Sequence, residues 1–224
     1  MASSPFNKDF IKFFIELSAN NNRDWFNTNK ARYKTNVEEP FKDFIAIMIR
    51  QMQKVQDGLD GLEAKDCVFR IYRDVRFAKD KAPYKTHMAA LIGPGGRKDK
   101  TSPGMYLQLS AEDARLYSGA HMLDKNQLEA VRTAIVSDLM GFKKAYSGKK
   151  FAETFGEIHG EKNKRLNTTF AQAAEEEPLL YNKSFYYFKK WPAKEILKDD
   201  FSRSLISAYN AAKPVNEFLF RALK

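Results

Sequence analysis

The sequence predicts an α+β fold, with an antiparallel or mixed sheet and helices packed mainly on one face. Apolar residues recur at helical spacing near both ends of the chain, whereas several stretches between them alternate apolar and polar residues as strands do. Two of these stretches are separated by a short turn, which implies antiparallel pairing. The resulting order of helices, strand, hairpin, helices, strand and helix favours the α+β class.

Length and composition indicate one folded domain that spans residues 1–224. A chain with 43% hydrophobic residues, 18 Phe and 10 Tyr has the composition of a folded protein rather than a disordered one. A domain of this length buries roughly 70% of the surface of its unfolded chain. It can therefore form a core without disulfides or metals.

Three helices are expected in the first quarter of the chain. Phe6, Phe10 and Leu17 lie at helical spacing, which predicts a helix over residues 5–18. Asn20–Asn22 interrupts this pattern and supplies side-chain oxygens that can cap the next helix. Pro40 suits the first turn of a third helix, whose apolar stripe continues to about residue 56.

Residues 67–77 have the period of a strand. Phe69, Ile71, Val75 and Phe77 alternate with polar residues. Arg73 departs from the pattern, because its parity places it on the apolar side, where an unpaired guanidinium would be costly. Either a bulge turns Arg73 away, or it meets a carboxylate or an anionic ligand.

The second half of the chain predicts a hairpin followed by helices and a further strand. Met105–Ser110 and Ala114–Gly119 are expected to pair through a turn. A helix begins at Asp124, with Gln127 at the capping-box position. The later expected elements are a short helix over 151–158, a strand over Ser184–Phe188 and a long helix over 200–222 that Pro214 kinks or splits.

Cysteine content and the N-terminal pattern indicate a cytoplasmic protein. Cys67 is the only cysteine, so neither an internal disulfide nor a cysteine metal site is possible, as expected in a reducing compartment. Residues 1–17 carry Lys8, Asp9 and Lys12 inside an amphipathic pattern, unlike a secretory signal or a membrane span. We therefore expect no membrane partner.

The stretch Arg70–His87 concentrates the positive charge of a chain whose formal net charge is +10, which favours polyanions. Arginine forks match two phosphate or carboxylate oxygens at once, and lysines add point charge. A tyrosine among such cations can stack on a base or sugar, or it can anchor the loop by packing. The candidate ligand-binding residues are Arg73, Arg76, Lys79, Lys81, Tyr84 and Lys85.

Two alternatives stay open for this block. Its cations can instead form a structural ion network with carboxylates of the early helices, namely Asp24, Glu38 or Glu39. Asp74 is the tentative catalytic residue of a phosphate-directed hydrolase or transferase. The arginines on either side of Asp74 lower the pKa of its carboxyl, which makes it a poor general acid and favours a role in orienting them.

The three histidines and one helix start are further candidate components of a site. The histidines have no metal-binding spacing and no cysteine partner, so no metal site is expected, although His87 and His121 could act as acid or base. The helix start at Asn22 and Arg23 would complete a shared pocket if it faces the basic block.

The glycine-rich stretch Gly93–Thr101 is expected to be a flexible loop. It lacks a glycine before Lys100 and the strand-to-helix context of a phosphate loop. Arg97, Lys98 and Lys100 can nevertheless extend the positive surface over a bound ligand.

Arg70–Thr86 resembles the R-x-x-R-D-x-R-F-[AS]-x-[DN]-K-x-P-Y-K-T block of an uncharacterised bacterial and fungal family of domain-of-unknown-function proteins. One departure is His121, where the family pattern has a small residue, usually glycine. The resemblance covers nearly the whole chain and implies a single-domain α+β protein, with no assigned reaction or catalytic residues. Four further stretches of the chain are similar to other motifs of the same family: Asn21–Phe26, Tyr106–Leu109, Tyr117–Ala120 and Lys183–Tyr186.

The leading hypothesis is therefore a protein that binds a phosphate-type anion, either a small molecule or nucleic acid, through the Arg70–His87 block. The alternatives are a phosphate-directed hydrolase or transferase, and a non-catalytic interaction protein whose block is a structural ion network. The sequence determines neither a cofactor nor the oligomeric state.

Overall fold

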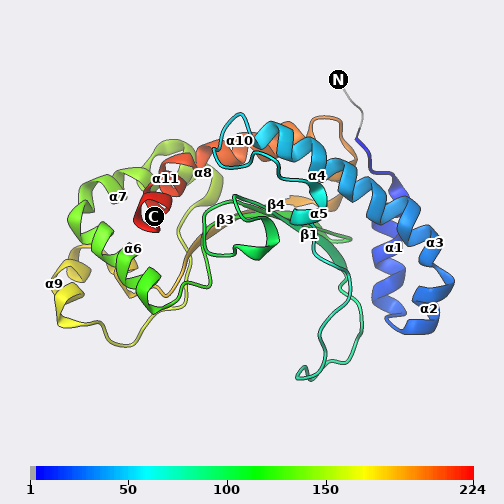
Figure 1. Cartoon of the computed structure of the whole chain (residues 1–224), viewed down its shortest axis with the longest axis horizontal. Helices are drawn as coiled ribbons and strands as arrows, with labels where there is room; N and C mark the ends of the chain where they lie inside the picture. The colour runs from blue at the N-terminus through cyan, green and yellow to red at the C-terminus, as the bar shows by residue number, and fades with distance from the viewer. Residues whose placement is uncertain (1–3) are drawn as a thin grey trace.

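A computed structural model describes residues 4–224 and shows a four-stranded antiparallel sheet with helices packed mainly on one face (Figure 1). Residues 1–3, which belong to the N-terminal stretch 1–17, lie outside the described range. The α+β prediction is confirmed, and every strand pair is antiparallel. The strands follow chain order as β1 (His87–Ile92), β2 (Met105–Ser110), β3 (Asp113–Ala120) and β4 (Phe185–Pro192).

Helices precede the sheet, interrupt it between β3 and β4, and end the chain. The first group is α1 (Lys8–Ala19), α2 (Arg23–Thr28), α3 (Lys30–Tyr33), a π-helical segment (Lys34–Glu38), α4 (Glu39–Met52) and α5 (Ala64–Cys67). The second group is α6 (Lys125–Ser137), α7 (Leu139–Ser147), α8 (Lys149–Phe155) and α9 (Thr168–Glu176). The last two are α10 (Phe201–Ala211) and α11 (Lys213–Ala222).

One face of the sheet forms the core together with the helices. Leu107, Leu109 and Leu116 are fully buried at every second position of β2 and β3, as the strand period requires. Helices α4, α8 and α11 contact β1, β4 and β3 respectively. Buried residues from both ends of the chain, including Phe13 and Phe201, belong to this one hydrophobic cluster.

The opposite face of the sheet stays partly open. Tyr106, Gln108, Arg115 and Tyr117 alternate with the buried residues and remain half-exposed. In Figure 1 helices α4, α8, α10 and α11 lie above the sheet, whereas α6 and α9 lie at one end of it and α1, α2 and α3 at the other. A ligand can therefore approach the sheet from the side that the helices leave open.

Local capping explains where several helices begin. The side chain of Asn22 accepts a hydrogen bond from Trp25 N at 2.9 Å, which confirms the predicted cap of α2. Asp124 and Gln127 form the predicted capping box of α6. Pro214 lies in the first turn of α11, after the break at Ala212, so the predicted C-terminal helix is split rather than kinked.

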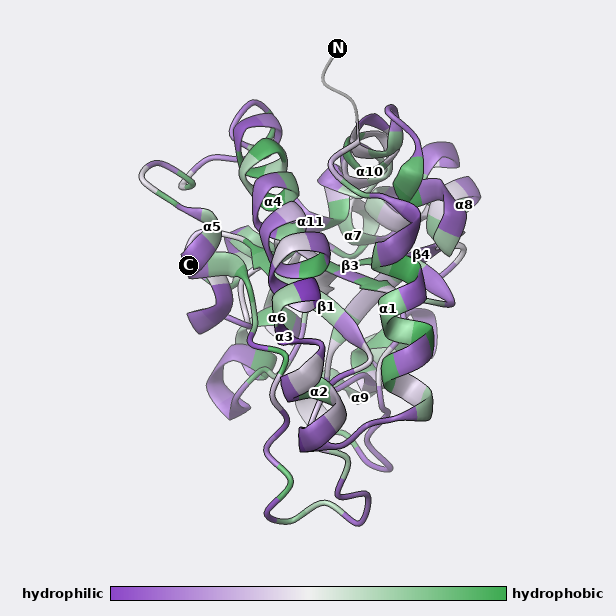
Figure 2. Ribbon diagram, turned by 90° about the vertical axis from the view of Figure 1, so that its right-hand side faces the viewer, coloured by the Kyte–Doolittle hydropathy of each residue, from purple (hydrophilic) through white to green (hydrophobic). Residues whose placement is uncertain are grey.

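The strand prediction for residues 67–77 is wrong. Helix α5 ends at Cys67, and the following residues make only the isolated bridges Val68↔Ala90 and Tyr72↔Tyr84. Residues 68–86 form instead an irregular hairpin, called here the arm, which extends away from the sheet (Figures 1 and 2). The chain leaves the edge strand β1 after the bridge at Val68, so the alternating residues that follow do not extend the sheet. The sequence did not predict β1 itself.

Among residues 4–224, none of the helices has the length and apolar character needed to cross a membrane.

Candidate functional site

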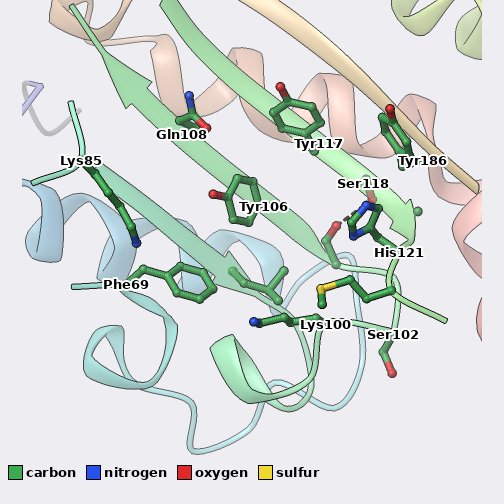
Figure 3. Close-up of a pocket in the computed structure, with 14 residues that line it drawn as sticks. Phe69, Lys85, Lys100, Ser102, Tyr106, Gln108, Tyr117, Ser118, His121 and Tyr186 are labelled. Carbon is green, nitrogen blue, oxygen red and sulfur yellow. Dashed lines mark hydrogen bonds between the residues drawn. The ribbon is translucent and has the colours of Figure 1, made fainter. Parts of the chain in front are cut away.

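A cavity of about 580 Å³ lies on the open face of the sheet (Figure 3). This volume is within the range of small-molecule binding sites. The strands contribute Tyr106, Gln108, Tyr117 and Tyr186 to its lining. The base of the arm contributes Phe69 and Lys85, and the loop between β1 and β2 contributes Lys100 and Ser102.

A tight approach of two strands shapes the end of the cavity beside His121. Gly119 has φ +108°, and a Cβ at this position would lie 2.1 Å from the carbonyl oxygen of Phe185. Only glycine fits such a conformation and such a close approach. Gly119 therefore lets β3 and β4 pair closely where Tyr186 and His121 enter the lining.

The charged side chains of the cavity lining are both basic. Lys85 and Lys100 line it, and the lining contains no aspartate or glutamate. Neither ammonium group forms an ion pair with a carboxylate of residues 4–224. The cavity thus presents positive charge that the protein itself leaves unbalanced.

Lys85 is held in place by contacts at the base of the arm. Its Nζ donates a hydrogen bond to the carbonyl oxygen of Arg70 at 3.0 Å and lies 5.5 Å from the centre of the Phe69 ring. Burial lowers the pKa of Lys85, and the positive charges of Arg70 and Lys100 lower it further. A bound anion would offset the repulsion among these cations.

Aromatic rings form much of the cavity wall. The centroids of Phe69 and Tyr106 lie 6.0 Å apart, and those of Tyr106 and Tyr117 lie 5.9 Å apart. Burial raises the pKa of the Tyr106 hydroxyl, and Tyr117 raises it further, so this group stays protonated and able to donate a hydrogen bond. The site combines ring surfaces, hydroxyl groups and two lysines.

The family assignment follows from the sequence as a whole. The family described as conserved hypothetical protein DUF2461 matches residues 9–218. The chain belongs to the DUF2461 family. This confirms the resemblance noted from the central block, and the matched range contains every residue of the cavity. A comparison with curated proteins finds no match.

Of the candidate ligand-binding residues predicted in this DUF2461 chain, Lys85 reaches the cavity. Tyr84 does not, because its ring is buried and stacks on Phe26 with centroids 3.9 Å apart and an angle of 15°. Asn21 fixes the Tyr84 backbone by donating to its carbonyl oxygen at 2.9 Å and accepting from its N–H at 3.1 Å. The start of α2 thus touches the block, but α2 contributes no residue to the cavity lining.

The other four candidates lie on the arm, outside the cavity lining. Arg73 donates to Asp80 at 2.6 Å, and Arg76 donates to Asp74 at 2.7 Å. The Nζ of Lys81 donates to the carbonyl oxygen of Val75 at 3.0 Å, and Lys79 is exposed. An ion network does exist in this block, but it is local to the arm.

The predicted partners of that network are wrong. Glu38 pairs with Lys42 and Glu39 with Lys34, because these residues lie close together within the helical segment that precedes the arm. Asp24 forms no ion pair with the arm among the described residues. The carboxylate that Arg73 meets is Asp80, seven residues further along the chain.

Asp74 has the acidity that the sequence predicts. Its hydrogen bonds from the Arg76 side chain and backbone lower the pKa of its carboxyl. Its side chain is exposed on the arm and lies outside the cavity lining.

Of the cations in the loop between β1 and β2, Lys100 reaches the cavity, whereas Arg97 donates a hydrogen bond to the carbonyl oxygen of Val68 at 3.2 Å.

Sequence reasoning missed the cavity residues of the strands. The signal was present in the hairpin, where Tyr106 and Gln108 share one parity and Tyr117 shares the matching parity on the paired strand. His121, the departure from the family pattern, also lines the cavity. Parity shows which residues share a face, but it does not show that the helices leave this face open.

No cluster of His, Cys, Asp or Glu suited to a metal ion occurs within the described range 4–224. His121 and His159 lie on either side of Tyr186, with each ring centroid 5.7 Å from that of the tyrosine. Cys67 is buried, and burial raises the pKa of its thiol to about 12, so it is a poor nucleophile.

Proposed function

We propose that this protein binds a phosphate-bearing ligand in the cavity on the open face of the sheet, with Lys85 and Lys100 as the groups that hold the phosphate. The observation that carries the proposal is a cavity with two lysines and no carboxylate in its lining. A phosphate supplies the missing negative charge and accepts hydrogen bonds from both ammonium groups.

The two lysines bring positive charge to both sides of one aromatic ring of the cavity wall. In the view of Figure 3 their side chains lie on either side of the Phe69 ring. Lys100 contributes to the lowered pKa of Lys85, which places its charge within electrostatic range. An anion between them would turn this repulsion into attraction and would raise the pKa of Lys85 towards its usual value.

The rest of the cavity suits the non-phosphate part of such a ligand. Tyr106 and Tyr117 offer ring edges and faces, and Gln108 offers an amide that both donates and accepts hydrogen bonds. A flat ring attached to a phosphate would use all of these groups. A nucleotide therefore fits the chemistry of the lining better than inorganic phosphate alone.

The proposal separates Lys85 from the other cations of the predicted block. Arg73 and Arg76 are already paired with Asp80 and Asp74 on the arm. Lys79 and Lys81 are exposed there, outside the cavity lining, and the proposal gives them no contact with the ligand. Catalysis through Asp74 lacks comparable support, because this carboxylate is exposed on the arm and paired with Arg76.

Calorimetric titration of pyrophosphate and adenosine monophosphate tests the proposal. We expect saturable binding that Lys85→Gln and Lys100→Gln each weaken about tenfold or more, as for a lost charge-assisted hydrogen bond. The matched controls are Lys79→Gln and Lys81→Gln on the arm, which should bind as the wild type does. A ligand at a hundred times its dissociation constant adds about 2.7 kcal/mol of stability, which raises Tm by roughly 5–10 °C in a chain of this size.

Two results would contradict the proposal. One is the absence of binding or thermal shift for every phosphate compound at low salt. The other is a loss of binding in the arm variants with none in Lys85→Gln and Lys100→Gln, which would instead place the anion site on the arm as the sequence suggests.

A further inference from the structure

A row of aromatic rings crosses the open face and continues beyond the cavity. It starts at Phe69 and runs through Tyr106, Tyr117 and Phe188 to His159. Adjacent ring centroids are 6.0, 5.9, 5.3 and 5.1 Å apart. The first three rings line the cavity, whereas Phe188 and His159 lie outside its lining.

We propose that the ligand of this face is single-stranded nucleic acid, whose bases stack along the aromatic row while its phosphates meet Lys85, Lys100 and Lys190. The inference rests on the proposed phosphate site at Lys85 and Lys100. It extends that site to a strand of several nucleotides. Stacking on protein aromatic rings beside a cationic track is the general way in which single strands are bound.

The rings at the cavity end leave surface for stacking, whereas at the outer end one face of Phe188 already stacks on His159 at an angle of 28°. Phe69 and Tyr106 are inclined at 52°, and Tyr106 and Tyr117 at 71°, so these neighbours do not cover one another face to face. Tyr106, Tyr117 and Phe188 are half-exposed on the strands. A single mononucleotide would use the cavity alone and leave the outer end of the row without a partner.

Lys190 supplies positive charge at the outer end of the row. It lies two residues after Phe188 on β4, so both share the open face, and its Nζ is 5.5 Å from the centre of the Phe188 ring. Within residues 4–224 it forms no ion pair with a carboxylate. The row thus has cations at both ends.

The acidic residues near the row are balanced or peripheral. Asp113 is paired with Arg115 at 2.7 Å. Glu157 lies 3.6 Å from the Nδ1 of His159, and its side chain is 78% exposed. Charge complementarity on this face therefore favours a polyanion, and the rings favour one with unpaired bases.

Fluorescence anisotropy with labelled oligonucleotides tests the inference. The probes are oligo-dT and oligo-rU of two, four, six and eight nucleotides, and a duplex of eight base pairs, at 50–200 mM salt. We expect affinity to rise with length up to about six nucleotides and the duplex to bind more weakly. Three phosphate contacts predict a slope of log affinity against log salt of about −2.

Two variants at the outer end of the row give the decisive comparison. Phe188→Leu and Lys190→Gln should each weaken hexanucleotide binding about fivefold or more, while pyrophosphate binding at the cavity stays unchanged. Lys189→Gln is the matched control, because Lys189 pairs with Leu116 and has the opposite parity. Lys190 is exposed, so its substitution reports on binding even if Phe188→Leu disturbs the fold.

The outcomes separate this inference from the proposed function. If pyrophosphate binds but Lys190→Gln and Phe188→Leu leave hexanucleotide affinity intact, the cavity is a phosphate site and the strand inference is overturned. Equal affinity for duplex and single strand also overturns it, since the rings would then contribute nothing. If neither pyrophosphate nor any oligonucleotide binds, both proposals fail.

Discussion

His87 is the residue whose ionisation should be most visible in the stability of the protein. It lies at the start of β1, and burial, together with the positive charges of Lys85 and Arg115, lowers the pKa of its imidazole to about 4. In the unfolded chain a histidine has a pKa of about 6.5. The unfolded state therefore binds more protons than the folded state between pH 6.5 and 4, and stability falls as the pH falls through this window.

We predict that unfolding at pH 5 costs about 2 kcal/mol less than at pH 7, from these two pKa values. Urea denaturation at both pH values measures the difference, and His87→Gln should remove most of it. The carboxyl groups with lowered pKa values, such as Asp9 and Asp80, change the stability of the protein only near pH 4 and below, where they become protonated. A wild type that is equally stable at pH 5 and pH 7 would show that His87 is not buried in its neutral form.

Tyr84 tests the assignment of a predicted ligand contact to the core. Tyr84→Ala should lower the free energy of unfolding by about 3–5 kcal/mol, because a buried ring stacked on Phe26 is lost. Tyr84→Phe keeps the stack and should cost less than about 1 kcal/mol. Chemical denaturation measures both. A Tyr84→Phe variant that keeps its stability but loses phosphate binding would show that the Tyr84 hydroxyl belongs to the ligand site.

Single residues also show what the sequence could and could not predict. The sequence left Arg73 either turned away by a bulge or next to a carboxylate or an anion, and it meets the carboxylate of Asp80. It could not tell that both residues lie on an exposed hairpin, with 29% and 67% of their side chains accessible. An exposed pair contributes about 0–1 kcal/mol, so the 3–5 kcal/mol of a buried pair does not apply here.

The arm is the element whose position most changes the interpretation of the basic block. Residues 74–82 include no buried side chain, and Phe77 is 95% exposed. The base of the arm is different, since Tyr84 packs on Phe26 and Lys85 enters the cavity. One continuous motif thus spans an anchored base and an exposed tip.

Replacing residues 74–82 with Asn-Gly should therefore change the free energy of unfolding by about 1 kcal/mol or less. Arg73 N already bonds to the Pro83 carbonyl oxygen at 2.9 Å, so a two-residue turn can close the hairpin at this point. Urea denaturation measures the stability and calorimetry the binding of pyrophosphate, which we expect to persist. Loss of binding in a stable variant would show that the tip belongs to the site.

Elements with strong local signals were predicted well, and those set by tertiary context were not. Helices α1, α2 and α6 carry apolar periodicity or side-chain caps, and the β2–β3 hairpin carries alternation and a turn. The strand β1 lacks alternation, because five of its six residues are buried. Because β1 has neighbours on both faces, its residues are apolar on both faces, and the alternation of apolar and polar residues that marks a strand is absent.

At the scale of the whole molecule, function depends on which face of the sheet the helices leave open. Parity grouped the tyrosines of β2 and β3, but only the packing of α4, α8 and α11 on the other face makes them part of a cavity. Which face the helices cover is a property of the assembled fold and not of any single element. The net charge of +10 then favours anions on any open surface, and the cavity lining concentrates this preference around Lys85 and Lys100.

The most direct test of the central claim is a titration of the uniformly ¹⁵N-labelled protein with pyrophosphate, followed by amide chemical shifts. The cavity site predicts that the shifts concentrate at Lys85, Lys100–Gly104 and Tyr106, while residues 74–82 of the arm stay unchanged. Shifts confined to the arm, with none at Lys85 or Lys100, would contradict the cavity site and move the anion to the arm.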